Sequence, residues 1–240
     1  MVSAGGGTPV TGQLQANLKQ IDELHAKADW KGAYELAKRT HEEEPKNVEV
    51  AWRFARAAYS WADVCERKNG RRKALIAEGY RAAVDAHTAA PTDSNCCKWA
   101  AMCTGLFADN NAGSKEKIGK YLDQALALNP KDHLLLHARG HFSYSVANLT
   151  WFERKAAATF FTAPPTATVD EALQDFLEVE KLRPEWIDNL LHIARCFVAK
   201  QDKQKAAHYL QLAVKVDPHG HVLEEEALDE AKKLLKSLSK

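Results

Sequence analysis

The sequence predicts an all-helical protein built from stacked pairs of helices. Helix-forming alanine, leucine, lysine and glutamate are abundant, whereas only 12 Gly and 8 Pro leave little room for the many turns of an all-β protein. Apolar residues recur at helical spacing, as Leu14, Leu18, Ile21 and Leu24 do near the start of the chain. Prolines that close helices then recur along the chain in similar contexts.

The composition excludes several classes of protein. With 45% hydrophobic and 27% charged residues, the chain of 240 residues has ordinary globular composition. Its 33 basic and 32 acidic side chains give a net charge of +1, which argues against a general nucleic-acid binder. Five cysteines without a CxxC pair, and no secretory signal, indicate reduced thiols in the cytosol. No apolar run approaches the ~18–20 residues that span a bilayer, so we expect a cytoplasmic protein without a transmembrane segment.

The first helical pair shows the kind of repeat. Residues 1–12 are rich in Gly, Ser and Thr and predict a disordered tail, which leaves residues 13–240 as a single helical domain. In the segment 28–47, ADWKGAYELAKRTHEEEPKN, a small residue, an Asp-aromatic pair, Ala33 at a helix seam and a closing proline follow one another. This order is typical of the second helix of a tetratricopeptide (TPR) unit, and its partner helix precedes it.

The closing prolines give the period of the repeat. They are Pro45, Pro91, Pro130, Pro184 and Pro218. The step from Pro184 to Pro218 is 34 residues, which is the TPR period. The other steps are 46, 39 and 54 residues, so we expect insertions, which we place at 66–73, 109–115 and 148–165.

Within the units, small and large residues recur at corresponding positions. They are Trp52 and Tyr59 on a first helix, Gly140 at a close approach of two helices, Ala172 with Phe176, and Ala206 with Leu210 on second helices. Thr168 and Glu171 form a capping-box pattern at a helix start. The last stretch, 221–240, reads as one more helix that covers the final repeat. The prediction is a TPR-like superhelix of about five helical pairs plus a C-terminal capping helix.

The sequence contains no catalytic signature. Nucleophile elbow, Walker loop, GxGxxG and HExxH patterns are all absent, so we expect no enzyme and no cofactor. His133, His137 and His141 lie four residues apart, but no cysteine is suitably spaced and Asp132 points to another face; we interpret them as histidines on a polar surface, not metal ligands. The cysteines at 96, 97 and 103 are expected to be small buried side chains.

The first helices of stacked pairs line a concave binding surface. Counting seven residues forward from each preceding proline gives Trp52, Lys98, His137 and Leu191, with Arg53 in place of Trp52 if Trp52 and Tyr59 occupy the packing seam. The predicted partner-binding residues are Arg53, Lys98, His137, His141 and Arg195, with Trp61 and Tyr144 about a turn further on. Basic and aromatic side chains suit an acidic, extended ligand. A solvated groove that happens to contain cations explains the pattern equally well.

The sequence resembles the regulator of microtubule dynamics family over most of residues 20–238. The resemblance is most specific in LTWFERKAAATFFTAPPTATVDEALQDFLEVEKLRP (149–184), and WRFARAAY (52–59) and GKYLDQALALNPKD (119–132) add to it. The resemblance implies a TPR-like protein that binds microtubules, with roles in spindle organisation and chromosome segregation for soluble members. For a membrane-anchored member it implies organelle contact and phospholipid binding, but this chain lacks that member's N-terminal membrane segment, which argues against tethering here.

Three kinds of partner therefore remain open. The basic groove residues suit acidic tubulin tails on microtubules. We then expect the protein in the cytoplasm, at the cytoskeleton and spindle. An apolar cavity near Trp151, Phe152, Phe160 and Phe161 would suit phospholipid, although the pattern favours packing of the long insertion by these side chains over a ligand slot. The third kind is a peptide from another protein, for which the chain acts as a scaffold.

Overall fold

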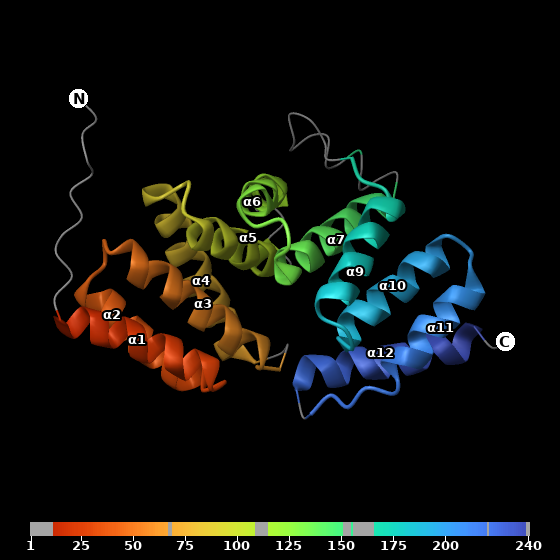
Figure 1. Cartoon of the computed structure of the whole chain (residues 1–240), viewed down its shortest axis with the longest axis horizontal. Helices are drawn as coiled ribbons and strands as arrows, with labels where there is room; N and C mark the ends of the chain where they lie inside the picture. Colours follow the sequence, from red (N-terminus) through yellow and green to blue (C-terminus); the bar gives the residue numbers. More distant parts are fainter. Residues whose placement is uncertain are drawn as a thin grey trace.

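The computed structural model describes residues 12–66, 69–108, 115–150, 155, 166–219 and 221–238. This described part consists of α-helices joined by short turns and contains no strand (Figure 1). The helices are α1 (Gly12–Ala26), α2 (Trp30–Glu43), α3 (Val48–Asp63), α4 (Gly70–Ala89), α5 (Ser94–Ala108), α6 (Lys115–Leu128), α7 (His133–Ala147), α9 (Val169–Leu182), α10 (Ile187–Ala199), α11 (Lys203–Ala213) and α12 (Val222–Leu238). The predicted fold class is confirmed.

Successive helices pack as pairs, and the pairs stack. The pairs are α1 with α2, α3 with α4, α5 with α6, α7 with α9, and α10 with α11, while α12 packs on α10 and α11. The first helices also contact one another in order, because α1 packs on α3, α3 on α5, α5 on α7 and α7 on α10. We call these five first helices the inner row. The stack curves, so that the start of α12 lies close to the end of α3 (Figure 1).

The helix boundaries follow from local chemistry. Four of the five closing prolines lie in the turn two residues after the second helix of a pair, and Pro218 lies five residues after the end of α11. Asn47 starts α3 by accepting hydrogen bonds from the backbone N–H groups of Glu49 and Val50. The predicted capping box at the start of α9 forms in both directions, since the Glu171 N–H donates to Thr168 Oγ1 at 3.1 Å and the Thr168 N–H to Glu171 Oε2 at 2.7 Å.

Gly140 allows α7 and α9 to approach closely. A Cβ atom at this position would lie 2.9 Å from Cε1 of Phe176, closer than carbon atoms pack. The Phe176 ring is fully buried and cannot easily give way. The predicted roles of Gly140 and of the seam residues Ala172 and Phe176 are therefore confirmed.

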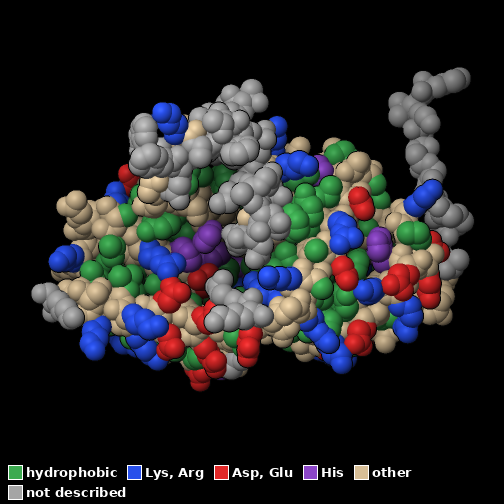
Figure 2. All heavy atoms as spheres, turned by 180° about the vertical axis from the view of Figure 1, so that it is seen from behind, with side chains coloured by type: hydrophobic (Ala, Val, Ile, Leu, Met, Phe, Trp, Pro, Cys, Tyr) green, Lys and Arg blue, Asp and Glu red, His purple; other side chains and the backbone are tan. Residues whose placement is uncertain are grey.

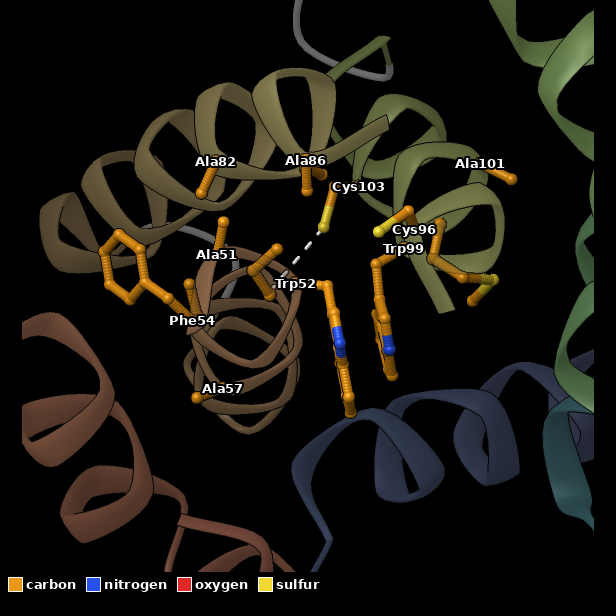
Figure 3. Close-up of a cluster of buried hydrophobic side chains, with 14 of the residues drawn as sticks. Ala51, Trp52, Phe54, Ala57, Ala82, Ala86, Cys96, Trp99, Ala101 and Cys103 are labelled. Carbon is orange, nitrogen blue, oxygen red and sulfur yellow. Dashed lines mark hydrogen bonds between the residues drawn. The ribbon is translucent and has the colours of Figure 1, made fainter. Parts of the chain in front are cut away.

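Small side chains bring the helices of the N-terminal half together. Figure 3 shows Ala51 of α3 and Ala82 and Ala86 of α4 in the same buried cluster as Trp52 and Cys103. The cysteines at 96, 97 and 103 are buried as predicted, and Cys103 Sγ lies 3.7 Å from the carbonyl oxygen of Ala55. Burial raises the pKa of the Cys103 thiol, which keeps it protonated and unreactive.

Some predicted features fall outside the described residues. They are the tail up to residue 11, most of the expected insertions at 109–115 and 148–165, and the aromatic set Trp151, Phe152, Phe160 and Phe161. Of the expected insertion at 66–73, Gly70 to Lys73 form the first turn of α4 instead of a loop. Among the described helices, none combines the length and the apolar character that a membrane span requires.

Candidate functional site: the concave surface

The inner row carries two hollows and a histidine cluster between them. On the face seen in Figure 2, histidine side chains gather near the middle of the molecule, beside lysine or arginine side chains. One hollow, of about 360 Å³, lies between α3, α5 and the start of α12, and we call it the N-terminal hollow. The other, of about 420 Å³, lies between α7, α10 and α12, and we call it the C-terminal hollow.

One face of α3 supplies a large part of the wall of the N-terminal hollow. Trp52, Arg56, Tyr59 and Asp63 all line it, and their spacing of four, three and four residues places them on one side of a helix. Trp30 of α2 and Trp99 of α5 add to the aromatic lining, and Figure 3 shows the Trp52 and Trp99 side chains extending from the same side of the core cluster. The hollow is therefore an aromatic slot with a basic group, Arg56, in its wall.

Two polar atoms in this hollow have no hydrogen-bond partner within the described part of the chain. They are Nε of Arg56 and Nδ1 of His221, and both are shielded from water. Arg56 already binds Asp22 through Nη2, and His221 Nε2 lies 3.9 Å from Asp63 Oδ2. Buried polar atoms without partners are costly and uncommon, so a pair of them beside one hollow makes this hollow a candidate site.

Lys98 is the second cation of the N-terminal hollow. Its ammonium group binds Asp132 Oδ2 at 2.6 Å and lies 5.6 Å from the centre of the Trp99 ring. His25, which also lines the hollow, adds no charge at neutral pH, because burial and the neighbouring Arg56 lower its pKa to about 4. Positive charge here comes from Arg56 and Lys98.

The C-terminal hollow is more apolar. Tyr144, Leu191, Val198 and Leu234 supply most of its lining, and Arg195 lies at its edge. The Arg195 guanidinium binds the Glu230 carboxylate of α12 and is therefore neutralised.

The histidine cluster joins α7 to α10. His137 Nε2 lies 3.0 Å from Asp188 Oδ2, and His137 Nδ1 lies 3.3 Å from Asn189 Oδ1. His192 Nδ1 lies 2.9 Å from the backbone oxygen of Asp188 and 3.5 Å from its Oδ1. The His141 ring is centred 5.1 Å from that of His192. The cluster thus consists of an i,i+4 pair on each of two facing helices.

Electrostatics in this cluster favour an ionised carboxylate and neutral His141. Burial alone would raise the pKa of Asp188, but the charges and hydrogen bonds of His192 and His137 hold it well below its usual value. The side chain of His141 is open to solvent at one side and surrounded by protein atoms on the others. This partial desolvation, followed by the charges of His192 and His137, lowers its pKa to about 4.

The structure does not bring all seven predicted partner-binding residues together. Lys98 lines the N-terminal hollow, Arg195 and Tyr144 line the C-terminal hollow, and His137 and His141 lie between them. Arg53 lies outside the lining of both hollows, where it stacks 4.1 Å from the centre of the Trp52 ring and binds Asp22.

Trp61 lies away from both hollows. It contacts Tyr34 of α2, with ring centres 4.9 Å apart, and lies beneath the Arg71 guanidinium of α4. It therefore faces the second helices and not the inner surface.

Four residues of these sites were not predicted from the sequence: Arg56, Asp188, His192 and His221. The signal for Arg56 was available, because it lies four residues after Trp52, the position that the count from Pro45 reaches without a shift. The signal for Asp188 and His192 was their own i,i+4 spacing. His221 could not be found by counting, since its place in the hollow depends on how far the stack curves.

Solved structures define the class of protein. A thermophilic TPR protein of Thermus thermophilus superposes with a TM-score of 0.55 at 15% identity, covering 89% of this chain and 98% of that one. MamA from Desulfovibrio magneticus superposes with a TM-score of 0.55 at 11% identity, covering 86% and 96%. The chain is thus a TPR-like helical repeat protein.

Sequence comparison then gives the family. The family model described as Regulator of microtubule dynamics protein 1-3 matches residues 17–239. Regulator of microtubule dynamics protein 1 of Caenorhabditis elegans is 38% identical over 190 residues, covering 77% of this chain and 82% of that protein. Regulator of microtubule dynamics protein 2 of Homo sapiens is 31% identical over 237 residues, covering 95% of this chain but only 57% of that protein. The chain belongs to the regulator of microtubule dynamics family, as the sequence resemblance predicted.

Proposed function

We propose that this chain is a non-catalytic, microtubule-associated module that holds an acidic, extended segment of tubulin in its N-terminal hollow. It acts in the cytoplasm at the cytoskeleton and spindle, in spindle organisation and chromosome segregation. The names of its relatives and its TPR-like fold support this class of function. The observation that carries the choice of site is the pair of unpartnered atoms, Arg56 Nε and His221 Nδ1, in an aromatic hollow of the described chain.

The chemistry of this hollow suits an acidic side chain. A carboxylate accepts the free N–H of Arg56, and charge-assisted bonds of this kind are about twice as strong as neutral ones. The rings of Trp52 and Trp99 provide an apolar wall for the backbone and methylene groups of the ligand. Because Asp22 and Asp132 already bind the two cations, an incoming carboxylate gains only part of the full attraction. We therefore expect modest affinity that falls as salt is added.

The experiment is co-sedimentation of the purified chain with microtubules across a salt series. We expect pelleting at low salt that weakens with salt and that Arg56→Gln and Lys98→Gln each reduce. Lys181→Gln is the matched control, because Lys181 is an exposed cation of α9 that pairs with Glu178 of its own helix. Circular dichroism confirms that each variant is folded.

The outcomes separate the function from the site. Pelleting that is unchanged in both hollow variants would keep microtubule binding and exclude the N-terminal hollow. Absence of pelleting at low salt would exclude direct microtubule binding.

Phospholipid binding is the second candidate. The apolar lining of the C-terminal hollow, with Arg195 at its edge, favours it. Lipid that co-purifies with the chain, stays bound at high salt and is lost in Val198→Gln, whose side chain is half-buried in the lining, would support this alternative. A peptide from another protein, for which the chain would act as a scaffold, is the remaining alternative, and it would occupy the same N-terminal hollow.

A further inference from the structure

The histidine cluster has the ligand types and spacing of a transition-metal site. One nitrogen each of His137 and His192 and one oxygen of Asp188 lie within 4.8 Å of one another. Two imidazoles and a carboxylate are a donor set that zinc and related divalent ions prefer. No other group of three such residues in the described part of the chain meets this criterion.

The distances match those of ligands around one small ion. Two ligands at about 2.0–2.1 Å from a tetrahedral zinc ion are roughly 3.3 Å from each other. His137 Nε2 and Asp188 Oδ2 are 3.0 Å apart, and His192 Nδ1 and Asp188 Oδ1 are 3.5 Å apart. These two pairs, which use different oxygens of Asp188, are near the separation that one ion requires, and the ligand nitrogens of His137 and His192 lie within 4.8 Å of each other.

The hydrogen bonds of Asn189 orient His137 as a ligand. Asn189 Nδ2 donates to the backbone oxygen of Phe176 at 3.0 Å, so its Oδ1 is the atom that faces His137 Nδ1, at 3.3 Å. His137 Nδ1 must then carry a proton and donate it to Asn189. This leaves Nε2 pointing at the Asp188 carboxylate, and two such atoms at 3.0 Å need either a shared proton or a cation between them. A ligating histidine that donates its other N–H to a fixed acceptor is the usual outer-shell arrangement of metal sites.

The supporting structure around these side chains is rigid. Asn189 is fully buried and His192 is nearly so. The Trp186 ring is tilted against the His137 ring with centres 4.1 Å apart, and the Phe176 ring meets it edge-on at 5.4 Å. Residues held in this way keep a binding geometry without the cost of ordering them when the ion arrives.

We propose that His137, Asp188 and His192 bind a divalent transition-metal ion, zinc by preference, with the fourth coordination position open to the concave surface beside His141. Binding at His192 replaces one of its two present hydrogen bonds, either Nδ1 to the Asp188 carbonyl or Nε2 with Arg195 at 3.4 Å. The ion joins α7 to α10 and adds positive charge to the inner row. The proposal does not depend on microtubule binding.

The test uses the full chain without a histidine tag, stripped of metal by a chelator. Co²⁺ is titrated first, because its visible absorption reports tetrahedral coordination, and Zn²⁺ then displaces it. We expect one ion per chain, with Zn²⁺ displacing Co²⁺. His137→Gln and His192→Gln should each weaken binding by roughly 10–100-fold or more, because loss of a ligand costs at least as much as loss of an outer-shell partner.

His208→Gln is the control, since His208 is an exposed histidine on α11 outside the cluster. It should bind Co²⁺ as the unaltered chain does. Circular dichroism checks the folding of every variant, and if His137→Gln fails to fold, His192→Gln and Asp188→Asn decide the matter. The proposal is overturned if the folded, unaltered chain shows no saturable binding, if the cluster variants bind as tightly as the unaltered chain, or if His208→Gln loses binding equally.

Discussion

The two halves of the concave surface differ in how their charges are satisfied. In the C-terminal region, Arg195 binds Glu230, and Asp188 lies between two histidines. In the N-terminal hollow, one N–H of Arg56 and one ring nitrogen of His221 have no hydrogen-bond partner within the described chain. A cation with a complete set of partners offers little to a ligand, so the number of basic residues on a surface says less than their pairing does.

The cations predicted from sequence illustrate this point. Arg53, Lys98 and Arg195 each bind a carboxylate that comes from another part of the stack. These acids lie far away in the chain, so counting positions on one helix could not reveal them. Because these carboxylates pair with the cations, the inner surface carries alternating positive and negative groups and not a continuous basic stripe.

The largest expected effect tests whether the two regions unfold as one unit. Phe176 belongs to the core beneath the histidine cluster and not to the N-terminal core. Phe176→Ala should lower the free energy of unfolding by about 3–5 kcal/mol, through lost burial and the cavity it leaves. Urea unfolding followed by tryptophan fluorescence and circular dichroism measures it. Coincident transitions would show one cooperative unit, and separated transitions would show that the C-terminal region unfolds alone.

A smaller effect is expected from Gly140→Ala. The added methyl group would meet the buried Phe176 ring at 2.9 Å, so the variant should lose about 1–3 kcal/mol of stability through overpacking. Gly105→Ala is the control, because nothing in the described chain lies within 4 Å of a Cβ there and Ala favours helix. Thermal unfolding of both variants is compared with that of the unaltered chain. Equal stability of Gly140→Ala and the unaltered chain would contradict the close approach of α7 and α9.

The two regions are compared directly by neutralising one arginine in each. Arg56→Gln should weaken microtubule binding about tenfold, which corresponds to about 1.4 kcal/mol, in the range of one charge-assisted hydrogen bond. Arg195→Gln should change binding by less than about twofold, because Glu230 already neutralises Arg195. Co-sedimentation at constant salt gives both numbers. The reverse order of effects would move the proposed site to the C-terminal hollow.

A dependence of stability on pH is expected in both regions. His25 and His141 have pKa values of about 4 in the folded chain, lowered from 6.5. Between these values the unfolded chain binds more protons than the folded chain, so the stability is complete above pH 6.5 and falls as the pH decreases towards 4. His25→Gln and His141→Gln should each flatten this part of the profile, measured by urea unfolding at several pH values.

The fold could be predicted from the sequence because its signals are local. Prolines after each second helix, the capping box at Thr168 and the small-then-large spacing of Ala172 and Phe176 all depend on spacing along the chain. The site could be predicted only in part. Lys98 lines a hollow, as the count from the preceding proline predicted, but Arg53 lies outside both hollows. Arg56 lines the N-terminal hollow, and the count reaches it only without the one-residue shift. His221 enters the N-terminal hollow only through the curvature of the whole stack, which no local pattern encodes.

The contact between His221 and Asp63 determines when, during synthesis, the N-terminal hollow becomes complete. The N-terminal hollow draws its walls from α3 and α5 but one of its unpartnered atoms from residue 221, near the other end of the described chain. During synthesis the aromatic walls can form while the last repeats are still inside the ribosome. The site becomes complete only when the final helix has emerged and packed. A chain shortened before α12 would therefore keep its aromatic slot but lack the group that closes it.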